Sequence, residues 1–258
     1  MAHSTKARHS VDGGYPCGEE TRTRIIDAAI TLFGDRGFEG ASTRDIATAA
    51  GVAAPALQYY FDNKEGLYLA CADYIATRIW NHLAEVVGRA EQILADNGSE
   101  TALIEAFCAI QTQAAHWMFT SRATHDWRLF MARGQAGLGP PAGIEIINER
   151  VNRRVQNASV AIVGRLLGRS KTDEESLIRM LALGGQLVIF HMLRGNVLST
   201  MKWDAIDAAR GEFLTRLVNE QTAVLLRYFA ANRDANGGSE DSSCNTISAN
   251  PTAATPHY

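Results

Sequence analysis

The sequence predicts an all-α protein with a short N-terminal helical unit and a larger C-terminal one. Apolar residues recur at spacings of three and four through most of the chain, which is the period of an amphipathic α-helix. No segment shows the sustained apolar–polar alternation of a half-buried β-strand. Hydrophobic residues make up 46% of the 258 residues, so the composition is globular and can supply a sizeable core.

The two ends of the chain are predicted to be disordered. Residues 1–20 are polar and contain glycine without any periodic pattern. In residues 232–258 the only large aliphatic side chain is Ile247, among many Gly, Ser, Asn, Thr and Pro residues. Such segments cannot bury enough apolar surface to offset the entropy lost on ordering. We therefore expect an arm and a tail on either side of the folded part.

Three helices are predicted at the start of the folded part. The first ends at Gly37, because glycine accepts the left-handed backbone at a helix end. Its apolar face consists of Ile25, Ile26, Ala29, Leu32 and Phe33. A second helix runs from an N-cap at Ser42 or Thr43 to Ala50, and a third from about Pro55 to Tyr60.

A long fourth helix is predicted from Lys64 to about Arg89, with Asp62 or Asn63 as its N-cap. Its apolar face contains Leu67, Cys71, Tyr74, Ile75, Ile79, Leu83 and Val86. The remaining helices are expected at about 100–120, 124–133, 142–168, 172–198 and 204–231.

The second and third helices form a predicted helix-turn-helix, with Ala50-Gly51-Val52 as the turn. Glycine permits a backbone angle at the turn that other residues resist. Ile46 and Ala47 would face the first helix, and Val52 and Leu57 would hold the second helix of the motif against it. The second helix of such a motif fits the major groove of DNA, where base edges present distinguishable patterns of donors, acceptors and methyl groups.

At these residues the chain resembles the TetR/AcrR family of transcription regulators. The resemblance is carried by Thr43-Arg44-Asp45-Ile46-Ala47, Ala50-Gly51-Val52, Leu57-Gln58-Tyr59-Tyr60-Phe61 and Lys64-Glu65-Gly66-Leu67-Tyr68. Within the family, Tyr59 to Ala72 is similar to the CecR-like subgroup. The resemblance implies an N-terminal three-helix bundle with a helix-turn-helix, and a C-terminal helical domain for ligand binding and dimerisation. Expected boundaries are 21–66 for the DNA-binding domain and 67–231 for the C-terminal domain.

The resemblance also implies roles for single residues. Thr43, Arg44 and Lys64 would contact phosphate, as would Tyr59 and Tyr60. The base-facing positions would be Ala54, Pro55, Ala56 and Gln58. Gln58 suits adenine and the alanine methyls suit thymine. Ala53 stands where the family usually has a capping Ser, Thr or Asp.

The charge balance argues against strong non-specific DNA binding. The formal net charge is -3, and from Thr21 to Glu65 five Lys/Arg residues stand against six Asp/Glu residues. Any affinity for DNA must then come from local placement of positive charge.

The last two helices predict a homodimer. Their apolar residues spread over more than one face, which a monomer surface rarely exposes. A two-fold four-helix bundle between subunits would bury them, and the operator would then be roughly palindromic. A larger core within one chain is the alternative. The expected dimer contacts are Leu187, Phe190, Leu214, Leu217, Gln221 and Leu225.

The expected effector is a small molecule held in the C-terminal domain, since small-molecule pockets mix apolar walls with a few polar anchors. Arg133 is the predicted anchor for an anionic ligand, because its guanidinium can hold a carboxylate through two bonds. The predicted ligand-binding residues are Phe107, Gln111, Trp117, Phe130, Arg133 and His191.

Other classes of protein are weakly supported. We find no catalytic or nucleotide-binding motif, and we expect no cofactor and no metal site. The four cysteines fit no zinc spacing, and a reducing cytoplasm suits them. No apolar stretch reaches the roughly 20 residues of a membrane helix. A thiol sensor using Cys71 and Cys108 is one alternative, and an activator in place of a repressor is another.

Overall fold

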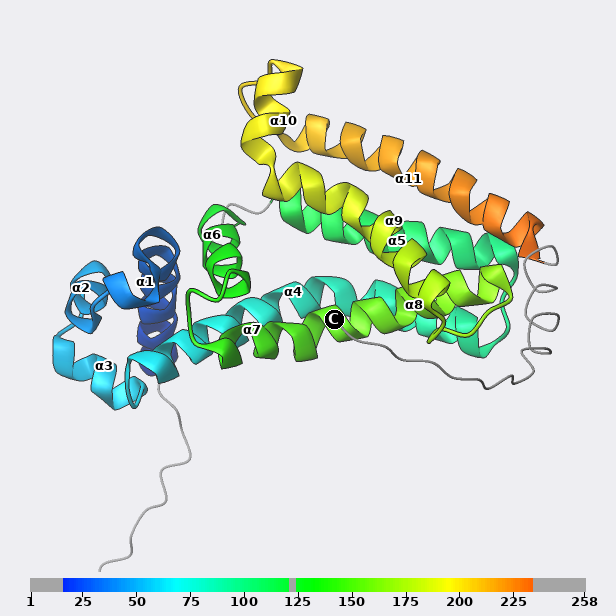
Figure 1. Cartoon of the computed structure of the whole chain (residues 1–258). Helices are drawn as coiled ribbons and strands as arrows, with labels where there is room; N and C mark the ends of the chain where they lie inside the picture. Colours follow the sequence, from blue (N-terminus) through cyan, green and yellow to red (C-terminus); the bar gives the residue numbers. More distant parts are fainter. Residues whose placement is uncertain (1–15, 121–123, 234–258) are drawn as a thin grey trace, which may run out of the picture.

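The computed structural model describes residues 16–120 and 124–233, and every regular element within these ranges is helical (Figure 1). The elements in chain order are α1 (Pro16–Gly40), α2 (Thr43–Ala49), α3 (Ala54–Tyr60), α4 (Lys64–Ala95), α5 (Glu100–Thr120), α6 (Thr124–Gln135), α7 (Pro141–Ile147), the π-helical turn η1 (Asn148–Asn152), α8 (Arg153–Leu167), α9 (Glu174–Met192), α10 (Arg194–Met201) and α11 (Ala208–Ala231). The all-α prediction is confirmed.

Helices α1 to α3 form the small bundle at one end of the molecule (Figure 1). Its centre is apolar: Ile30, Phe33 and Ile46 are at most 1% exposed. Gly37 has φ +76°, so the regular helix ends there as predicted, and a last short turn runs on to Gly40. At the other end α1 begins at Pro16, five residues before the expected boundary at 21. Proline suits the first position of a helix because that amide has no partner within the helix.

The 32-residue α4 leads from the small bundle into the larger one (Figure 1). Asn63 is its N-cap, and the Asn63 side chain accepts a hydrogen bond of 2.8 Å from the Gly66 amide. Leu67, Ile75 and Val87 are fully buried along its length. One rigid element therefore contributes to the cores of both units.

The predicted helix over 142–168 contains the π-helical turn η1, which separates α7 from α8. A π turn has i→i+5 hydrogen bonds and so holds one residue more than the α-helix around it. Gly143, Ile147 and Val151 are buried at successive spacings of four. This whole helix lies along α4.

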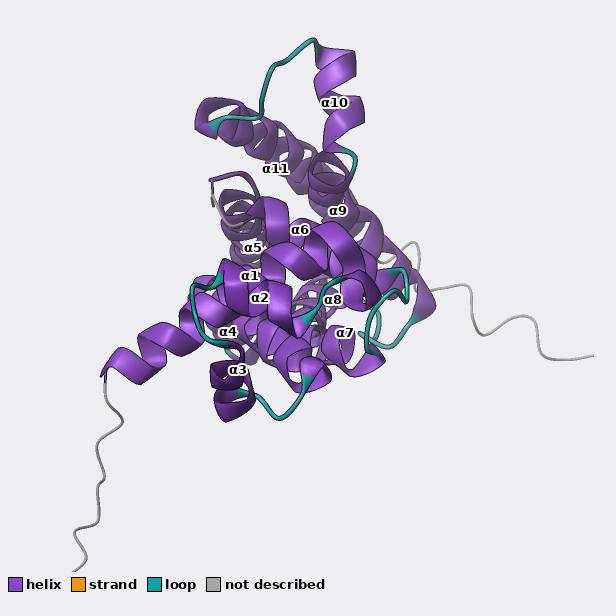
Figure 2. Ribbon diagram, turned by 90° about the vertical axis from the view of Figure 1, so that its left-hand side faces the viewer, coloured by secondary structure: helices purple, strands orange, loops and turns teal. Residues whose placement is uncertain are grey.

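The predicted single helix over 172–198 is two helices. The chain bends by 77° between α9 and α10, at Leu193, whose ψ of 32° is not helical. In Figure 2, α10 and the loop after it stand away from the other helices, on the side opposite α3. Among the described residues no single helix is long and apolar enough to cross a membrane. The bent α9–α10 pair taken together has the length and the composition of a membrane span.

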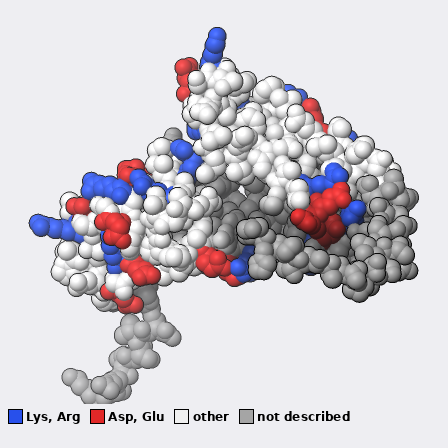
Figure 3. All heavy atoms as spheres, in the orientation of Figure 1, with Lys and Arg blue, Asp and Glu red and all other residues white. Residues whose placement is uncertain are grey.

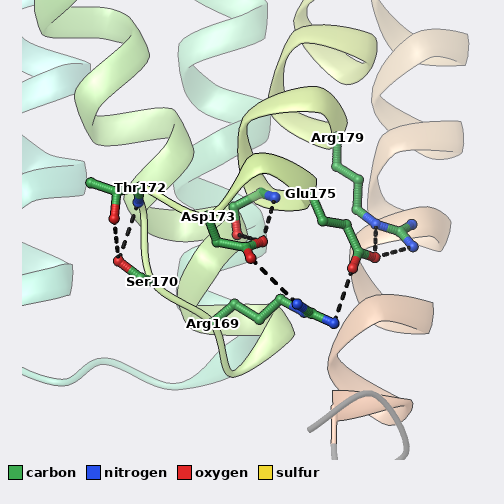
Figure 4. A network of polar contacts seen from close by, with 7 residues as sticks. Arg169, Ser170, Thr172, Asp173, Glu175 and Arg179 are labelled. Atoms are coloured by element: carbon green, nitrogen blue, oxygen red, sulfur yellow. Dashed lines mark hydrogen bonds and ion pairs between the residues drawn. The ribbon is translucent and has the colours of Figure 1, made fainter. Parts of the chain in front are cut away.

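The loop between α8 and α9 is held by a network of charged side chains (Figure 4). Arg169 contacts Asp173 at 3.3 Å and Glu175 at 3.2 Å, and Glu175 also pairs with Arg179 at 2.6 Å. Asp173 caps α9 by accepting from the Ser176 amide, and this bond lowers the pKa of its carboxyl group. The network fixes the start of α9 against α8.

Candidate nucleic-acid interface and effector domain

Helices α2 and α3 adopt the predicted helix-turn-helix. Ser42 is the N-cap of α2, and its hydroxyl oxygen accepts a bond of 3.1 Å from the Asp45 amide. Gly51 has φ +65° at the turn, a conformation that L side chains rarely adopt. Ile46 and Leu57 are buried between the helices. The second helix is thereby held in a fixed orientation.

Five of the nine predicted DNA-binding residues line one shallow hollow between α2 and α3. Its volume is about 510 Å³. The five residues are Thr43, Arg44, Ala54, Pro55 and Gln58, and all of them are exposed. The start of α2 and the exposed face of α3 thus place a guanidinium, a hydroxyl and an amide on the same surface.

The other four predicted residues surround this surface. Tyr59 is 84% exposed and meets the half-buried Tyr60 edge to face at 5.1 Å between ring centroids. Ala56 is half-buried. Lys64 turns towards α1, with its ammonium 4.5 Å from the Phe38 ring centroid and 3.4 Å from the Glu39 carbonyl oxygen. Its charge therefore lies at the junction of α1 and α4.

The expected missing cap at Ala53 is confirmed, since no side-chain hydrogen bond caps α3. Figure 3 shows that lysine and arginine side chains around α1 to α3 are interspersed with aspartate and glutamate. Arg36, for example, is paired with Asp45 at 3.2 Å. Positive charge at this end is local, as the composition predicts.

Helix α6 fastens the C-terminal unit to α1. The Arg133 guanidinium donates to the Gly34 carbonyl oxygen at 2.6 Å and to the Asp35 carbonyl oxygen at 2.8 Å. Thr31 donates to the Asp126 carboxylate at 2.7 Å. A Cβ on Gly34 would lie 3.1 Å from the Asp126 carbonyl oxygen, so the absence of a side chain permits this close approach.

The structure does not gather the six predicted ligand-binding residues around one cavity. Arg133 donates to the backbone of α1 and lines a hollow between α1 and the loop before α7, in which none of the other five residues lies. Phe130 stacks on Tyr68 at 4.5 Å between centroids. Phe107 and Trp117 belong to the apolar core. Gln111 and His191 are buried polar residues of α5 and α9.

His191 has a distinctive environment. It is 7% exposed, and its Nε2 atom has no hydrogen-bond partner. Burial lowers the pKa of its imidazole to about 4, with further contributions from the positive charges of Arg128 and Arg194. The ring is therefore neutral near pH 7.

The predicted dimer residues fall into two groups. Leu187 and Leu214 are at most 5% exposed and belong to one apolar cluster inside the chain. They lie on the inner faces of α9 and α11. Leu217 and Leu225 are exposed, as is Gln221, and Phe190 is half-buried.

Helices α9 and α11 carry an outer apolar face, of which only Leu217 and Leu225 were among the predicted dimer contacts. Its residues are Ile178, Leu181, Val188, Ile189 and Met192 on α9, and Phe213, Leu217, Val224, Leu225 and Tyr228 on α11, each 37–62% exposed. On α9 the spacing of three and four marks a single stripe. Helical phase, more than composition, would have separated this face from the inner one.

Cys71 and Cys108 are free thiols. Cys71 is fully buried, and burial raises its pKa well above the ordinary value. Burial also raises the pKa of Cys108. Thiolates are disfavoured at both sites, which weakens the redox alternative. Within residues 16–120 and 124–233, no group of three or more His, Cys, Asp and Glu side chains is placed to hold a metal.

Two family profiles match the chain. Residues 25–71 match the profile described as bacterial regulatory proteins of the tetR family. Residues 103–228 match the C-terminal domain of the HTH-type transcriptional dual regulator CecR. The two matches cover the helix-turn-helix and most of the larger unit.

Individual relatives agree with the profiles. The chain is 28% identical to the HTH-type transcriptional dual regulator CecR of Shigella flexneri over 81% of its own length and 93% of that protein. It is 33% identical to the HTH-type transcriptional repressor KstR2 of Rhodococcus jostii over 36% of its length and 42% of the relative. Its fold is similar to AibR, solved in complex with isovaleryl coenzyme A and operator DNA, with a TM-score of 0.52, 17% identity, and coverage of 81% and 98%.

Proposed function

The chain belongs to the TetR family of DNA-binding transcription regulators, with a C-terminal domain of the CecR type, and we propose that it is a homodimeric repressor released from a palindromic operator by a small molecule. The family and its relatives are transcription regulators and not enzymes. The observation that carries the proposal is the single exposed surface formed by Thr43, Arg44, Ala54, Pro55 and Gln58. A regulator of this kind acts on the chromosome in the cytoplasm.

We assign the DNA-binding domain to residues 21–66. Ala54, Pro55, Ala56 and Gln58 on α3 would read base edges. Because most of these side chains are apolar, the contacts would favour thymine methyl groups, with Gln58 bonded to adenine. Thr43, Arg44, Tyr59, Tyr60 and Lys64 would bind phosphate and set the register.

The outer apolar face of α9 and α11 supports dimerisation through residues 67–231. Several exposed large apolar side chains on two adjacent helices form a patch of the kind that marks a protein interface. A Cβ added to Gly184 or to Gly185 would meet no atom within 4 Å, so a partner helix can approach closely there. A two-fold dimer presents two α3 helices and therefore matches a palindrome.

Two elements would carry the effector signal to the DNA. Helix α4 belongs to both cores, and α6 is bound to α1 through Arg133 and Asp126. A ligand that binds better to one arrangement of the C-terminal domain would shift these helices and change the spacing of the two α3 helices. Equal operator affinity and equal spacing with and without the effector would exclude this coupling.

Selection of preferred sites from random duplex DNA tests the proposal. The wild-type chain should enrich a palindromic sequence, and Tyr59→Ala and Lys64→Ala should each weaken binding to it. Gln58→Ala should relax the preference at one position of each half-site, whereas the phosphate variants should weaken all sequences alike. No enrichment, or unchanged binding by these variants, would refute the DNA assignment.

An activator is the second candidate. The CecR relative is a dual regulator, whereas the KstR2 relative is a repressor. Transcription measured from the selected operator, with and without the protein, decides between them. Lower transcription with the protein supports repression, and higher transcription supports activation.

A further inference from the structure

Helices α1, α4, α6 and α7 meet where the small bundle joins the larger one (Figure 1). Lys64 and Tyr68 lie four residues apart on α4 and therefore on the same face of that helix. Lys64 would bind phosphate under the proposed function, whereas Tyr68 is a core residue that is 3% exposed. The contacts that hold the Lys64 ammonium in place thus matter for DNA binding.

Phe38, in the last turn of α1, holds the Lys64 side chain. The Lys64 ammonium lies over the Phe38 ring, 4.5 Å from its centroid, and donates to the Glu39 carbonyl oxygen at 3.4 Å. An ammonium over the face of an aromatic ring is attracted by the quadrupole of the ring. The bond to Glu39 uses one of the three N–H groups of an ammonium, so donors remain for a phosphate oxygen.

The Phe38 ring is itself oriented by other rings. Its centroid lies 5.4 Å from that of Tyr68, and the two ring planes are 84° apart. Phe33 contacts both of them, at 5.8 Å from Phe38 and 5.2 Å from Tyr68 between centroids. Aromatic rings packed in this way prefer defined relative orientations. The position of Tyr68 therefore sets the orientation of the ring beneath the Lys64 ammonium.

Residues of the C-terminal domain enclose Tyr68. Phe130 of α6 stacks on it at 4.5 Å between centroids, with the ring planes 29° apart. A Cβ on Gly139, in the loop before α7, would lie 2.5 Å from the Tyr68 hydroxyl oxygen, and a Cβ on Gly143 would lie 2.5 Å from Tyr68 Cε1. Interiors packed this closely transmit displacements. A shift of α6 or of this loop would therefore move the Tyr68 ring.

The Phe38 ring has room to respond to such a movement. Phe38 is half-buried and lines the hollow of about 610 Å³ between α1 and the loop before α7. Gly139 and Leu138 of that loop line the same hollow, and Leu138 is 57% exposed. The ring that carries the ammonium is thus less confined than Tyr68, which is buried behind it.

We propose that Phe38 and Tyr68 are positioning residues through which the C-terminal domain controls the phosphate contact of Lys64. In this structure the Phe38 ring holds the ammonium at the junction of α1 and α4. Displacement of Tyr68 would withdraw that ring, and Lys64 would lose the fixed position that favours phosphate binding. This role rests on the proposed function and adds a route of control within one subunit, whereas a change in the spacing of the two α3 helices acts between subunits.

A double-mutant cycle on the operator recovered by site selection tests the role of Phe38. Phe38→Leu keeps an apolar side chain and removes the ring, so operator affinity should fall about tenfold, because each of two subunits loses one cation–π contact. The dependence of log affinity on log salt should become shallower, towards that of Lys64→Ala, whose slope should be smaller by about 2 for two lost phosphate contacts. In the Lys64→Ala background, Phe38→Leu should have no further effect.

Two controls accompany the cycle. Phe38→Tyr keeps an aromatic face beneath the ammonium and should bind the operator as the wild type does. Trp80→Leu also removes a ring from beneath a cation, since the Arg154 guanidinium lies 4.7 Å from the Trp80 centroid, but this contact joins α4 to α8 and should not affect operator affinity. Melting temperatures show that each variant is folded under the binding conditions.

Gly139→Ala tests the control by the C-terminal domain. The added Cβ would displace the Tyr68 ring, so operator affinity should fall about tenfold when Lys64 is present and should not change in the Lys64→Ala background. Gly88→Ala is the matched control, because Gly88 is exposed in α4 and a Cβ there meets no atom within 4 Å. It should leave operator affinity unchanged.

The outcomes separate this role from the proposed function. Failure of the wild-type chain to select any operator would overturn both. Equal operator binding by wild type and Phe38→Leu, or a loss in Phe38→Leu that is as large in the Lys64→Ala background, would overturn the positioning role alone. A loss in Phe38→Leu with none in Gly139→Ala would overturn the control by the C-terminal domain.

Discussion

The guanidinium of Arg133 joins α6 to α1 through the carbonyl oxygens of Gly34 and Asp35. These carbonyls lie in the turn just before Gly37, where α1 departs from helical geometry, and the last carbonyls of a regular helix lack partners within it. A positive charge there also interacts favourably with the helix dipole. One side chain therefore completes the helix end that precedes the DNA-reading motif.

Replacing Arg133 tests this role. Arg133→Ala should lower the free energy of unfolding by about 1–3 kcal/mol, because bonds from a charged donor are lost and two carbonyl oxygens lose their partner. Urea unfolding at one fixed protein concentration measures it. Arg216→Ala is the matched control: Arg216 makes an exposed ion pair within α11, so its loss should cost at most about 0.5 kcal/mol. Equal effects of the two substitutions would contradict the capping role.

His191 predicts a pH dependence. Burial, followed by Arg128 and Arg194, lowers the pKa of its imidazole from 6.5 to about 4. The unfolded chain thus takes up a proton at a higher pH than the folded chain, so stability is full above pH 6.5 and falls as the pH drops towards 4. The total loss is about 3 kcal/mol. In His191→Gln the loss of unfolding free energy between pH 6.5 and 4 should be smaller by that amount. An unchanged slope of unfolding free energy against pH in this variant would refute the role given to His191.

At the scale of single helices, two glycines should respond oppositely to the same substitution. A Cβ on Gly143 of α7 would lie 2.5 Å from Cε1 of Tyr68, a core residue of α4. Gly143→Ala should therefore destabilise by about 1–3 kcal/mol through overpacking. Gly88 is exposed within α4 and has open space around it, so Gly88→Ala should stabilise by about 0.5–1 kcal/mol. Thermal unfolding of both variants, compared with wild type, measures the two effects. Melting temperatures that shift in the same direction would contradict this packing.

Most helices were predictable because their signals are local. Ser42, Gly51 and Asn63 mark helix starts and turns through bonds to residues at most three positions away. The break at Leu193 was not predictable, since no Pro stands near it and the nearest glycine, Gly195, lies inside α10. The role of Arg133 was missed because its partner is 99 residues away. From the sequence alone, an Arg near the end of a helix can be interpreted equally well as a ligand anchor or as a cap for a distant helix.

At the scale of the whole molecule, the outer apolar face of α9 and α11 predicts the state of assembly. Leu181 lies in this face, and Leu138 lies in the loop before α7, and both are 57% exposed. Leu181→Glu would bury an unpaired charge in the proposed interface and should weaken the dimer about a hundredfold or more. Leu138→Glu should have no effect on assembly. Sedimentation equilibrium measures both, and a Leu181→Glu chain that remains dimeric would place the interface elsewhere.

The exposure of Thr43, Arg44, Ala54, Pro55 and Gln58 on α2 and α3 could be predicted from the sequence, whereas the positions of the six predicted ligand-binding residues could not. The former depends on seven-residue helices whose exposed positions follow directly from the turn at Gly51. The latter depend on how helices distant in the chain pack: Gln111 bonds a carbonyl oxygen 72 residues away, and Arg133 bonds one 99 residues away. No local pattern reports that packing.

The π-helical turn at 148–152 has a consequence for how this fold tolerates changes in length. A step of four residues overshoots one α-helical turn by about 40°, so the contact positions Gly143, Ile147 and Val151 would drift off the surface of α4 in an ideal helix. The extra residue of the π turn absorbs that drift, and α8 begins again in phase. An insertion of one amino acid can thus be stored as a local bulge while the flanking segments keep their neighbours.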